Sequence, residues 1–341
     1  MSWKRALLGL ARRTRLLRAV GAAYGRNRLT VLAYHRVIDH SSPGFDTLRR
    51  NVSATPEAFA GQMRAVAGYY SPVSLREVVA WLDGGPQLPA RPLLVTFDDG
   101  YRDNLEFALP ILREHDIPAT VFLASDHIGT REPFWWDLAA WCMMHTPLET
   151  ADLPGLGSRS WDGDGERDRV LGRWTQALKL LPQAEREAAM AEAAGALEVE
   201  VAADAFDGLL LSWDEVRGMR DAGVEFGAHT KRHPILTRVD PDRAREEIVE
   251  SKLRVEEETG VSVLGFAYPN GRPGDYTAET KQMVAAAGYR LAVTLSPGPA
   301  RPAEVRRDPL AVRRVTVHHR DHPSRFAAKI MGLGRIFKGL Q

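Results

Sequence analysis

Short apolar runs alternate with helical segments along most of the chain. The runs are rich in apolar and β-branched residues, and they are predicted to be buried strands at residues 29–34, 93–97, 118–124, 224–228, 261–267, 289–294 and 311–317. The segments between them carry helix start and stop signals. Strands that alternate with helices in this way predict an α/β protein with a mainly parallel sheet.

Capping residues mark several of the predicted helices. A Ser or Thr side chain can accept a hydrogen bond from the first turn, and Pro is tolerated at the first helical position. The signals are Thr55 before Pro56, Ser74 with Glu77, Ser212 with Glu215, Asp240 before Pro241, and the stops Gly223, Gly260 and Gly288. Further helices are predicted at residues 102–115 and 277–287.

One stretch breaks this rhythm. Residues 127–211 contain several tryptophans, a Gly/Asp/Arg-rich run and an Ala/Glu-rich helix near residues 184–197. We interpret this stretch as an insertion on the domain formed by residues 29–320, not as a separate domain. Residues 1–28 form a basic segment before the domain, and residues 321–341 form a basic tail after it.

The first 28 residues hold eight basic side chains, and no acidic residue comes before Asp39. Because basic residues interrupt its apolar positions, this segment is predicted to be neither a membrane span nor a signal peptide. Two interpretations remain open: an amphipathic helix docked on the domain, or one lying on an anionic membrane surface. The expected location is cytoplasmic, either free or peripheral at the inner membrane face.

The overall charge argues against a nucleic-acid-binding protein, and the cysteine content excludes a protein stabilised by intramolecular disulfides. The 341 residues hold 45 Lys and Arg against 44 Asp and Glu, a net charge of +1, so no global field favours a nucleic-acid partner. Cys142 is the single cysteine, which excludes an intramolecular disulfide. A hydrophobic content of 44% is sufficient for one large α/β domain or two small ones.

Polar residues follow several predicted strands directly. Residues 96–100 read TFDDG and residues 229–233 read HTKRH, while His35 and Tyr268 follow two other strands. Alone, an Asp-Asp-Gly run is commonly a turn or a helix cap, and two histidines four residues apart are commonly surface residues. In parallel sheets and barrels, however, the carboxyl ends of the strands share one edge, where active sites are built. We therefore expect these groups to converge.

Two carboxylates and two imidazoles in this spacing predict a metal hydrolase. Three of these four groups, from Asp98, Asp99, His229 and His233, can hold a Zn2+-like ion with a position left for water. The remaining carboxylate can take a proton from that water as it attacks a substrate.

With both motifs in this order, the chain resembles the polysaccharide deacetylases with a NodB homology domain, carbohydrate esterase family 4. The resemblance covers roughly residues 30–320 and implies a distorted (β/α) barrel that removes acetyl groups from N-acetylated sugars. It implies that Asp98 is the catalytic base. It also implies one divalent metal ion, Zn2+, held by Asp99, His229 and His233.

The third motif of the family departs from the usual pattern. Residues 266–271 read FAYPNG, so Ala267 occupies the place of the family's arginine, and Arg313 or Arg314 is the candidate replacement. The turn still offers the backbone N–H of Asn270 to an oxyanion. Tyr268 and Pro269 are the predicted substrate-binding residues. As an alternative, Pro-Asn-Gly is simply a good turn.

The family's general acid, a histidine in a late Leu-x-His motif, has no clean match here. Residues 31–35 instead resemble the first strand of the biofilm-type poly-N-acetylglucosamine deacetylases, whose rearranged barrel takes its acid histidine from that strand. We favour His35 over His318 as the acid.

These observations predict a metal-dependent hydrolase that removes N-acetyl groups from amino sugars of a polysaccharide, an oligosaccharide or a lipid-linked glycan. Its expected partners are the N-acetylated glycan and, peripherally, an anionic membrane. One alternative is a metal amidohydrolase acting on a non-sugar amide, because a fold does not determine its substrate. Another is a non-catalytic glycan or membrane-surface binder, which is disfavoured because neither the base nor a ligand is lost.

Overall fold

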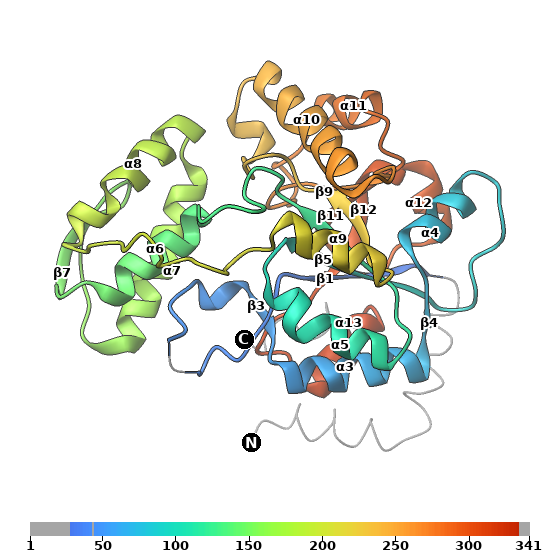
Figure 1. The fold of residues 1–341 in the computed structure, drawn as a ribbon, viewed down its shortest axis with the longest axis horizontal. Helices are drawn as coiled ribbons and strands as arrows, with labels where there is room; N and C mark the ends of the chain where they lie inside the picture. The colour runs from blue at the N-terminus through green and yellow to red at the C-terminus, as the bar shows by residue number, and fades with distance from the viewer. Residues whose placement is uncertain (1–27, 43, 334–341) are drawn as a thin grey trace.

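The computed structural model describes residues 28–42 and 44–333. Within this part of the chain, parallel strands form an eight-stranded sheet in the order β1, β12, β11, β10, β9, β6, β5, β4. Because β1 also pairs with β5, the sheet closes into a seven-stranded barrel, with β4 outside the ring (Figure 1). The predicted distorted (β/α) barrel is therefore confirmed.

The strands of the barrel are slightly shifted from their predicted positions. They are β1 (Thr30–Tyr34), β5 (Pro92–Asp99), β6 (Ala119–Leu123), β9 (Glu225–Ala228), β10 (Gly265–Ala267), β11 (Leu291–Pro297) and β12 (Val312–Thr316), with β4 at Ser71–Pro72. Two smaller sheets pair β2 (Arg36–Val37) with β3 (Val52–Ala54), and β7 (Thr150–Leu153) with β8 (Gly157–Ser160).

Helices surround this barrel and close one of its ends. They are α3 (Pro56–Tyr69), α4 (Leu75–Leu82), α5 (Leu109–Glu114), α9 (Trp213–Asp221), α10 (Pro241–Thr259), α11 (Ala278–Ala286), α12 (Pro302–Arg307) and α13 (Pro323–Ile330). Short helical turns are η1 (Arg49–Asn51), η2 (Asn104–Ala108), η3 (Leu236–Arg238) and η4 (Pro309–Ala311).

The predicted caps are present at these helices. Side chains of Thr55, Ser74, Ser212 and Asp240 accept hydrogen bonds from the first turns of α3, α4, α9 and α10. Helix α10 ends at Gly260, whose φ of 67° lies in the left-handed region that glycine adopts without a steric cost.

Successive side chains along each strand point alternately outward and inward, so the core consists of an outer layer and a barrel interior. On β5, Leu93, Val95 and Phe97 pack under the surrounding helices, whereas Leu94 faces the interior. The interior cluster extends to Trp81 of α4 and Val305 of α12, which close the amino-terminal end of the barrel. Asp98 lies four residues after Leu94 on β5, so the two side chains point to the same side of the strand. The carboxylate of Asp98 is therefore directed into the barrel.

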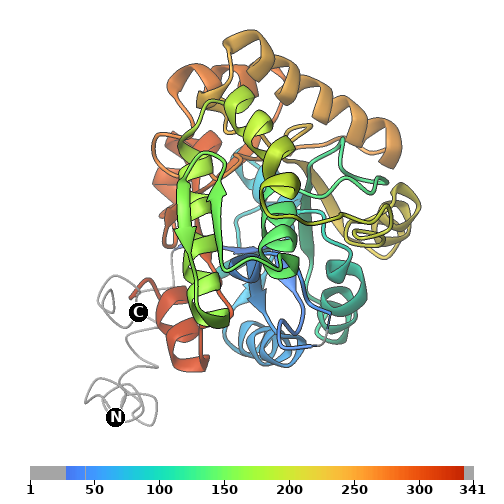
Figure 2. The same cartoon turned by 90° about the vertical axis from the view of Figure 1, so that its left-hand side faces the viewer.

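The stretch predicted as an insertion forms a helical lobe at the other end of the barrel. Its helices are α6 (Trp135–His145), α7 (Gly163–Leu180) and α8 (Gln183–Ala196), and the β7–β8 hairpin joins α6 to α7. They share a hydrophobic cluster that includes Trp136 and Trp174. Figure 2 shows this lobe lying across the end of the barrel.

Two predicted elements differ from the observed ones. The strand predicted at residues 261–267 is shorter, because the amide of Val263 donates to Glu256 of α10 and holds this part of the chain away from the sheet. The helix predicted at residues 102–115 begins with the π turn η2, where the Asn104 side chain donates to the His35 carbonyl. Such π turns frequently occur at functional sites.

The two terminal segments are only partly described. The predicted basic segment at residues 1–28 lies almost wholly outside the described residues, as does the end of the predicted tail. Within the tail, α13 buries Phe326 and Ile330 in the main core and packs beside α3. No helix in the described part of the chain is long and apolar enough to cross a membrane.

Candidate active site

The predicted chemical groups meet at the carboxyl ends of the barrel strands. Asp98 and Asp99 end β5, His35 follows β1, and His229 follows β9. The two aspartates and His229 are at most 2% exposed. The structure therefore brings together residues that are far apart in the sequence, at the end of the barrel covered by the helical lobe.

Left-handed backbone conformations are concentrated in these loops. Positive φ angles occur at Asp99 (78°), Thr230 (65°), His233 (57°) and Asn270 (59°). Non-glycine residues adopt this region only when their surroundings enforce it, and such positions cluster at functional sites. At Asp99 this conformation interrupts the alternating direction of the side chains along β5. The carboxylates of the adjacent residues Asp98 and Asp99 can therefore lie at the same site.

Asp99, His229 and His233 form a compact group of potential metal ligands. One ligand atom from each lies within 4.8 Å of the others. The Nε2 atoms of His229 and His233 lie 3.5 Å and 3.6 Å from Oδ1 of Asp99. Nδ1 of His229 donates to the carbonyl of Ala267 at 2.7 Å, which leaves the Nε2 lone pair directed at the group.

The electrostatics of this group fit a bound cation. Both carboxylate oxygens of Asp99 are buried without a hydrogen-bond partner among the described residues. Burial and the neighbouring Asp98 raise the pKa of Asp99, while burial lowers the pKa of both His229 and His233. Two neutral imidazoles and one carboxylate are a donor set that holds a divalent metal ion in catalytic sites.

Asp98 is paired with an arginine from a distant strand. Nη1 and Nη2 of Arg314 on β12 donate to the two carboxylate oxygens of Asp98, each at 2.7 Å, and both side chains are buried. Arg313 instead faces outward and pairs with Glu304. Of the two candidate replacements for the missing arginine at position 267, the structure therefore selects Arg314.

The pairing keeps Asp98 ionised. Burial is the largest single effect and would raise the pKa of this carboxyl, but the charge and hydrogen bonds of Arg314, together with His229 and His35, outweigh it and lower the pKa to about 2. Because the folded pKa lies below that of an unfolded aspartate, the ion pair contributes its full stability above about pH 4. That contribution is lost as the pH falls through about 2.

We expect Arg314→Gln to destabilise the protein by roughly 3–5 kcal/mol, because it leaves the Asp98 carboxylate buried without its partner. The pKa of Asp98 should rise, so the acid limb of the rate profile moves to higher pH, and kcat/KM at pH 7 falls on the order of a hundredfold. Denaturant unfolding and a pH–rate profile measure both effects. Arg313→Gln is the matched control. If the acid limb of Arg314→Gln lies at the same pH as that of the wild type, Arg314 does not lower the pKa of Asp98.

The two candidate acids occupy different surroundings. His35 interacts electrostatically with Asp98, Arg314 and His229, and burial lowers its pKa to about 4. His318 lies against His319, with ring centroids 4.2 Å apart, and its Nδ1 accepts from the amide of Arg320. The structure thus brings His35 to the site and does not bring His318 there.

The Pro-Asn-Gly turn after β10 lies beside Lys179 of the helical lobe. The Asn270 side chain donates to Asp275 at 2.6 Å and accepts from Nζ of Lys179 at 3.2 Å. Its backbone N–H has no acceptor among the described residues. A Cβ at Gly271 would lie 2.9 Å from the carbonyl of Tyr268, so this turn needs glycine.

Tyr268 lies in the barrel wall. Its side chain is 1% exposed, its ring stacks on Tyr276 with centroids 4.8 Å apart, and its hydroxyl donates to the Leu310 carbonyl. Pro269 is buried as well. The predicted contacts of Tyr268 and Pro269 with substrate remain predictions, and the contacts of the tyrosine ring are with the protein itself.

Lys179 was missed by sequence reasoning. It lies near the end of α7 in the helical lobe, and burial, followed by repulsion from Arg272, lowers its pKa to about 8. No motif marks this lysine, because its place beside Asn270 depends on how the lobe packs on the barrel. Arg314 had a weaker signal, namely its position on a predicted strand.

Together, a closed parallel barrel, a paired buried aspartate and an adjacent Asp-His-His group define a hydrolase of the barrel type. Comparison with known proteins agrees with this assignment to the hydrolases. A model of the polysaccharide deacetylase family matches residues 85–154 and 160–292, more than half of the chain. The chain belongs to the polysaccharide deacetylase family, carbohydrate esterase family 4.

Two curated relatives match parts of the chain. The poly-beta-1,6-N-acetyl-D-glucosamine N-deacetylase of Staphylococcus epidermidis is 29% identical over 116 residues, which cover 31% of this chain and 39% of that protein. YxkH of Bacillus subtilis is 20% identical over 231 residues, which cover 68% of this chain and 54% of YxkH. The chain therefore aligns with only about half or less of the length of these relatives.

Solved structures share the fold over nearly the whole chain. The deacetylase PplD of Streptococcus pyogenes, in complex with acetate, has a TM-score of 0.58 and 19% identity, covering 89% of this chain and 99% of PplD. IcaB of Ammonifex degensii has a TM-score of 0.55 and 21% identity, covering 91% of this chain and 97% of IcaB. These similarities concern the barrel and its elaborations, not the substrate.

Proposed function

We propose that this protein removes N-acetyl groups from amino sugars of a polysaccharide, an oligosaccharide or a lipid-linked glycan, with a divalent metal ion as cofactor. The observation that carries the proposal is the position of the Asp98–Arg314 pair beside Asp99, His229 and His233. An ionised carboxylate next to a set of metal ligands is what amide hydrolysis by activated water requires.

Asp99, His229 and His233 would hold the metal, and the two-histidine, one-carboxylate set favours Zn2+. Bound there, such an ion supplies Lewis acidity toward the acetyl carbonyl and toward water. Asp98 accepts a proton from the attacking water while Arg314 holds its carboxylate in place. The backbone N–H of Asn270 donates to the oxygen that becomes negative.

His35 completes the reaction by donating a proton to the amine as the carbon–nitrogen bond breaks. Burial keeps its imidazole neutral at pH 7 before reaction, with a pKa of about 4. The acid role therefore requires His35 to gain a proton during turnover, and the neighbouring Asp98 carboxylate, which raises this pKa, supports that step.

Acetate release tests the proposal directly. Purified protein, loaded with Zn2+, is incubated with N-acetylglucosamine oligomers and with non-sugar amides and imides. We expect acetate from the oligomers and slow or no turnover of the other amides. Turnover of the non-sugar amides alone would establish the alternative amidohydrolase function, and turnover of neither would favour a glycan or membrane-surface binder.

We expect His35→Ala to bind metal normally but to release the amine on the order of a hundredfold more slowly, because proton donation contributes about that much. His318→Ala should have a milder effect. An acetyl ester with a nitrophenol leaving group needs little protonation, so it should restore turnover in His35→Ala and not in Asp98→Asn. The same selective rescue in His318→Ala would place the acid on the late strand instead.

The basic residues of the first 28 positions support a further proposal, peripheral contact with an anionic membrane. The corresponding location is cytoplasmic, at the inner membrane face. Sedimentation with anionic vesicles, before and after deletion of residues 1–24, measures this contact.

A further inference from the structure

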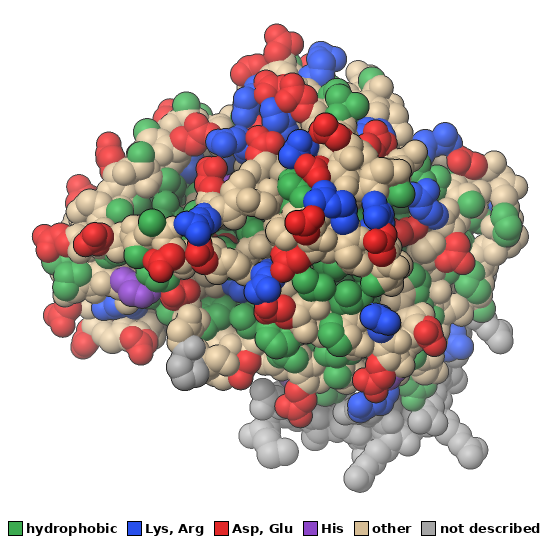
Figure 3. All heavy atoms as spheres, in the orientation of Figure 1, with side chains coloured by type: hydrophobic (Ala, Val, Ile, Leu, Met, Phe, Trp, Pro, Cys, Tyr) green, Lys and Arg blue, Asp and Glu red, His purple; other side chains and the backbone are tan. Residues whose placement is uncertain are grey.

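A cavity of about 260 Å³ lies between the barrel and the helical lobe. Its charged lining is dominated by Arg49, Arg50, Arg169 and Arg320, with His319 and the single carboxylate of Asp168. Over the face shown in Figure 3, by contrast, basic and acidic side chains are interspersed. In a protein of net charge +1, four arginines around one cavity are a local concentration of positive charge.

Among the residues that the structure describes, two of these arginines have no carboxylate partner. Arg49 pairs with Asp168 at 3.5 Å, and Arg169 pairs with Glu166 at 3.3 Å. Within the described residues, Arg50 and Arg320 form no ion pair. The guanidinium of Arg50 lies directly against the backbone of Gly172 in α7, where a Cβ would overlap it. The cavity thus presents unneutralised donors suited to an anion.

The cavity lies at the same end of the barrel as the candidate active site. The amide of Leu48 donates to Asp137 at 3.0 Å, and Asp137 also accepts from the hydroxyl of Tyr101 at 2.6 Å. Asn51 donates to the same hydroxyl at 3.2 Å. Tyr101 is two residues after Asp99, so these hydrogen bonds link Leu48 of the cavity lining to the chain segment that carries the predicted metal ligand.

Helix α7 connects the cavity with the catalytic turn. Asp168 and Arg169 line the cavity from its first half, and Lys179, eleven positions after Asp168, contacts Asn270 at its end. At 1.5 Å per residue, these ends are about 16 Å apart, an interval that several sugar units can span. Lys179 forms no ion pair with the described residues either.

We propose that this cavity binds an anionic group, a phosphate or a carboxylate, on a glycan that lies along α7 with its acetamido group at Asp98. The inference rests on the proposed deacetylase function and specifies its substrate class: N-acetylated glycans that carry negative charge a few units from the reacting sugar. Guanidinium groups match both anions because they donate paired hydrogen bonds.

The test compares an anionic and a neutral glycan of equal length, hyaluronan hexasaccharide and chitohexaose. For Arg50→Gln combined with Arg320→Gln, the ratio of kcat/KM for hyaluronan to that for chitohexaose should fall about tenfold, since two charge-assisted contacts are lost. Gly172→Ala should also lower the ratio. The added Cβ displaces the Arg50 side chain from this position without removing its positive charge. High salt should weaken the preference of the wild type.

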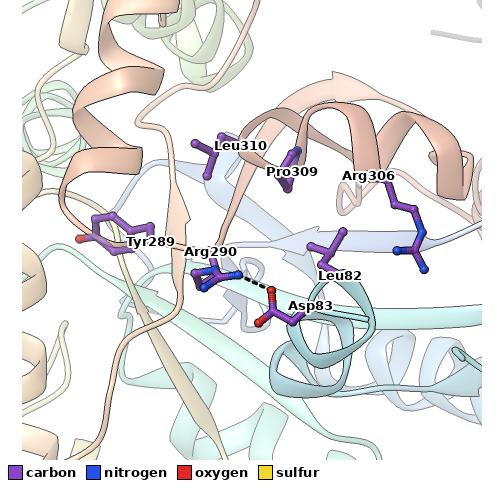
Figure 4. A pocket seen from close by; sticks show the side chains of 7 residues that line it. All are labelled: Leu82, Asp83, Tyr289, Arg290, Arg306, Pro309 and Leu310. Atoms are coloured by element: carbon purple, nitrogen blue, oxygen red, sulfur yellow. Dashed lines mark hydrogen bonds and ion pairs between the residues drawn. The ribbon is translucent and has the colours of Figure 1, made fainter. Parts of the chain in front are cut away.

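Arg306→Gln is the matched control. Arg306 lines a different cavity, of about 400 Å³, beside the Arg290–Asp83 ion pair at the amino-terminal end of the barrel (Figure 4). One positive charge is removed there, against two in the double variant, and it lies at the end of the barrel closed by α4 and α12, so the ratio should not change. Competition by inorganic phosphate and by glucuronate distinguishes the two anions, and the stronger competitor identifies the group.

An unchanged ratio in the double variant, or an equal fall in Arg306→Gln, would overturn the inference even if chitohexaose is deacetylated. If neither glycan releases acetate, the proposed function fails separately. Binding of hyaluronan hexasaccharide, followed by tryptophan fluorescence in the wild type and in the double variant, then decides the inference: equal affinity overturns it, and weaker binding by the variant supports it.

Discussion

Asp98→Asn is expected to lower kcat by at least about a thousandfold while the protein still binds its metal ion, because an amide cannot accept the proton of the attacking water. The side chain keeps nearly the same shape, and one oxygen remains to accept from Arg314. Steady-state acetate release and metal analysis of the same preparation measure the two quantities.

Asp99→Asn is the comparison for this variant. Its carboxylate has no hydrogen-bond partner among the described residues and is proposed as a ligand, so both metal content and turnover should fall. The adjacent carboxylates are thus distinguished by metal content, not by rate alone. If Asp98→Asn keeps its metal and most of its turnover, Asp98 is not the base.

Removing a proposed histidine ligand is expected to abolish activity through loss of the metal. His229→Ala deletes one of the three proposed ligands, and the bond from Nδ1 to the Ala267 carbonyl leaves Nε2 available for ligation. We expect the variant to retain a small fraction of the metal and no measurable turnover. A chelator should inactivate the wild type, and added Zn2+ should restore it.

Thermal stability gives a second measurement that does not depend on activity. A ligand that binds the folded state raises its stability, so Zn2+ should raise the Tm of the wild type and leave that of His229→Ala unchanged. His145→Ala is the control, since His145 is an exposed residue stacked on Trp141. An equal rise in Tm for wild type and His229→Ala would place the metal elsewhere.

The sequence alone determined the local structure and much of the chemistry. Buried strands and capped helices are set by neighbouring residues, so the capping boxes at Ser74 and Ser212 and the end of α10 at Gly260 were predictable. The placement of Asp98, Asp99 and His229 at strand ends followed from the same pattern, because parallel strands share one carboxyl edge. Strand β10 was overestimated, because the bond between Val263 and Glu256 joins separate elements.

Only the tertiary structure decided which distant side chains meet. Arg314 reaches Asp98 from a strand 216 positions away, through the interior of a closed barrel, and Lys179 reaches Asn270 from the helical lobe. His35 and His318 both follow predicted strands, yet only His35 lies among the groups around Asp98. Such contacts depend on barrel closure and on packing between layers. Local propensity and periodicity do not determine which residues far apart in the sequence come into contact. The sequence pattern therefore limits the candidate site residues, and the three-dimensional arrangement selects among them.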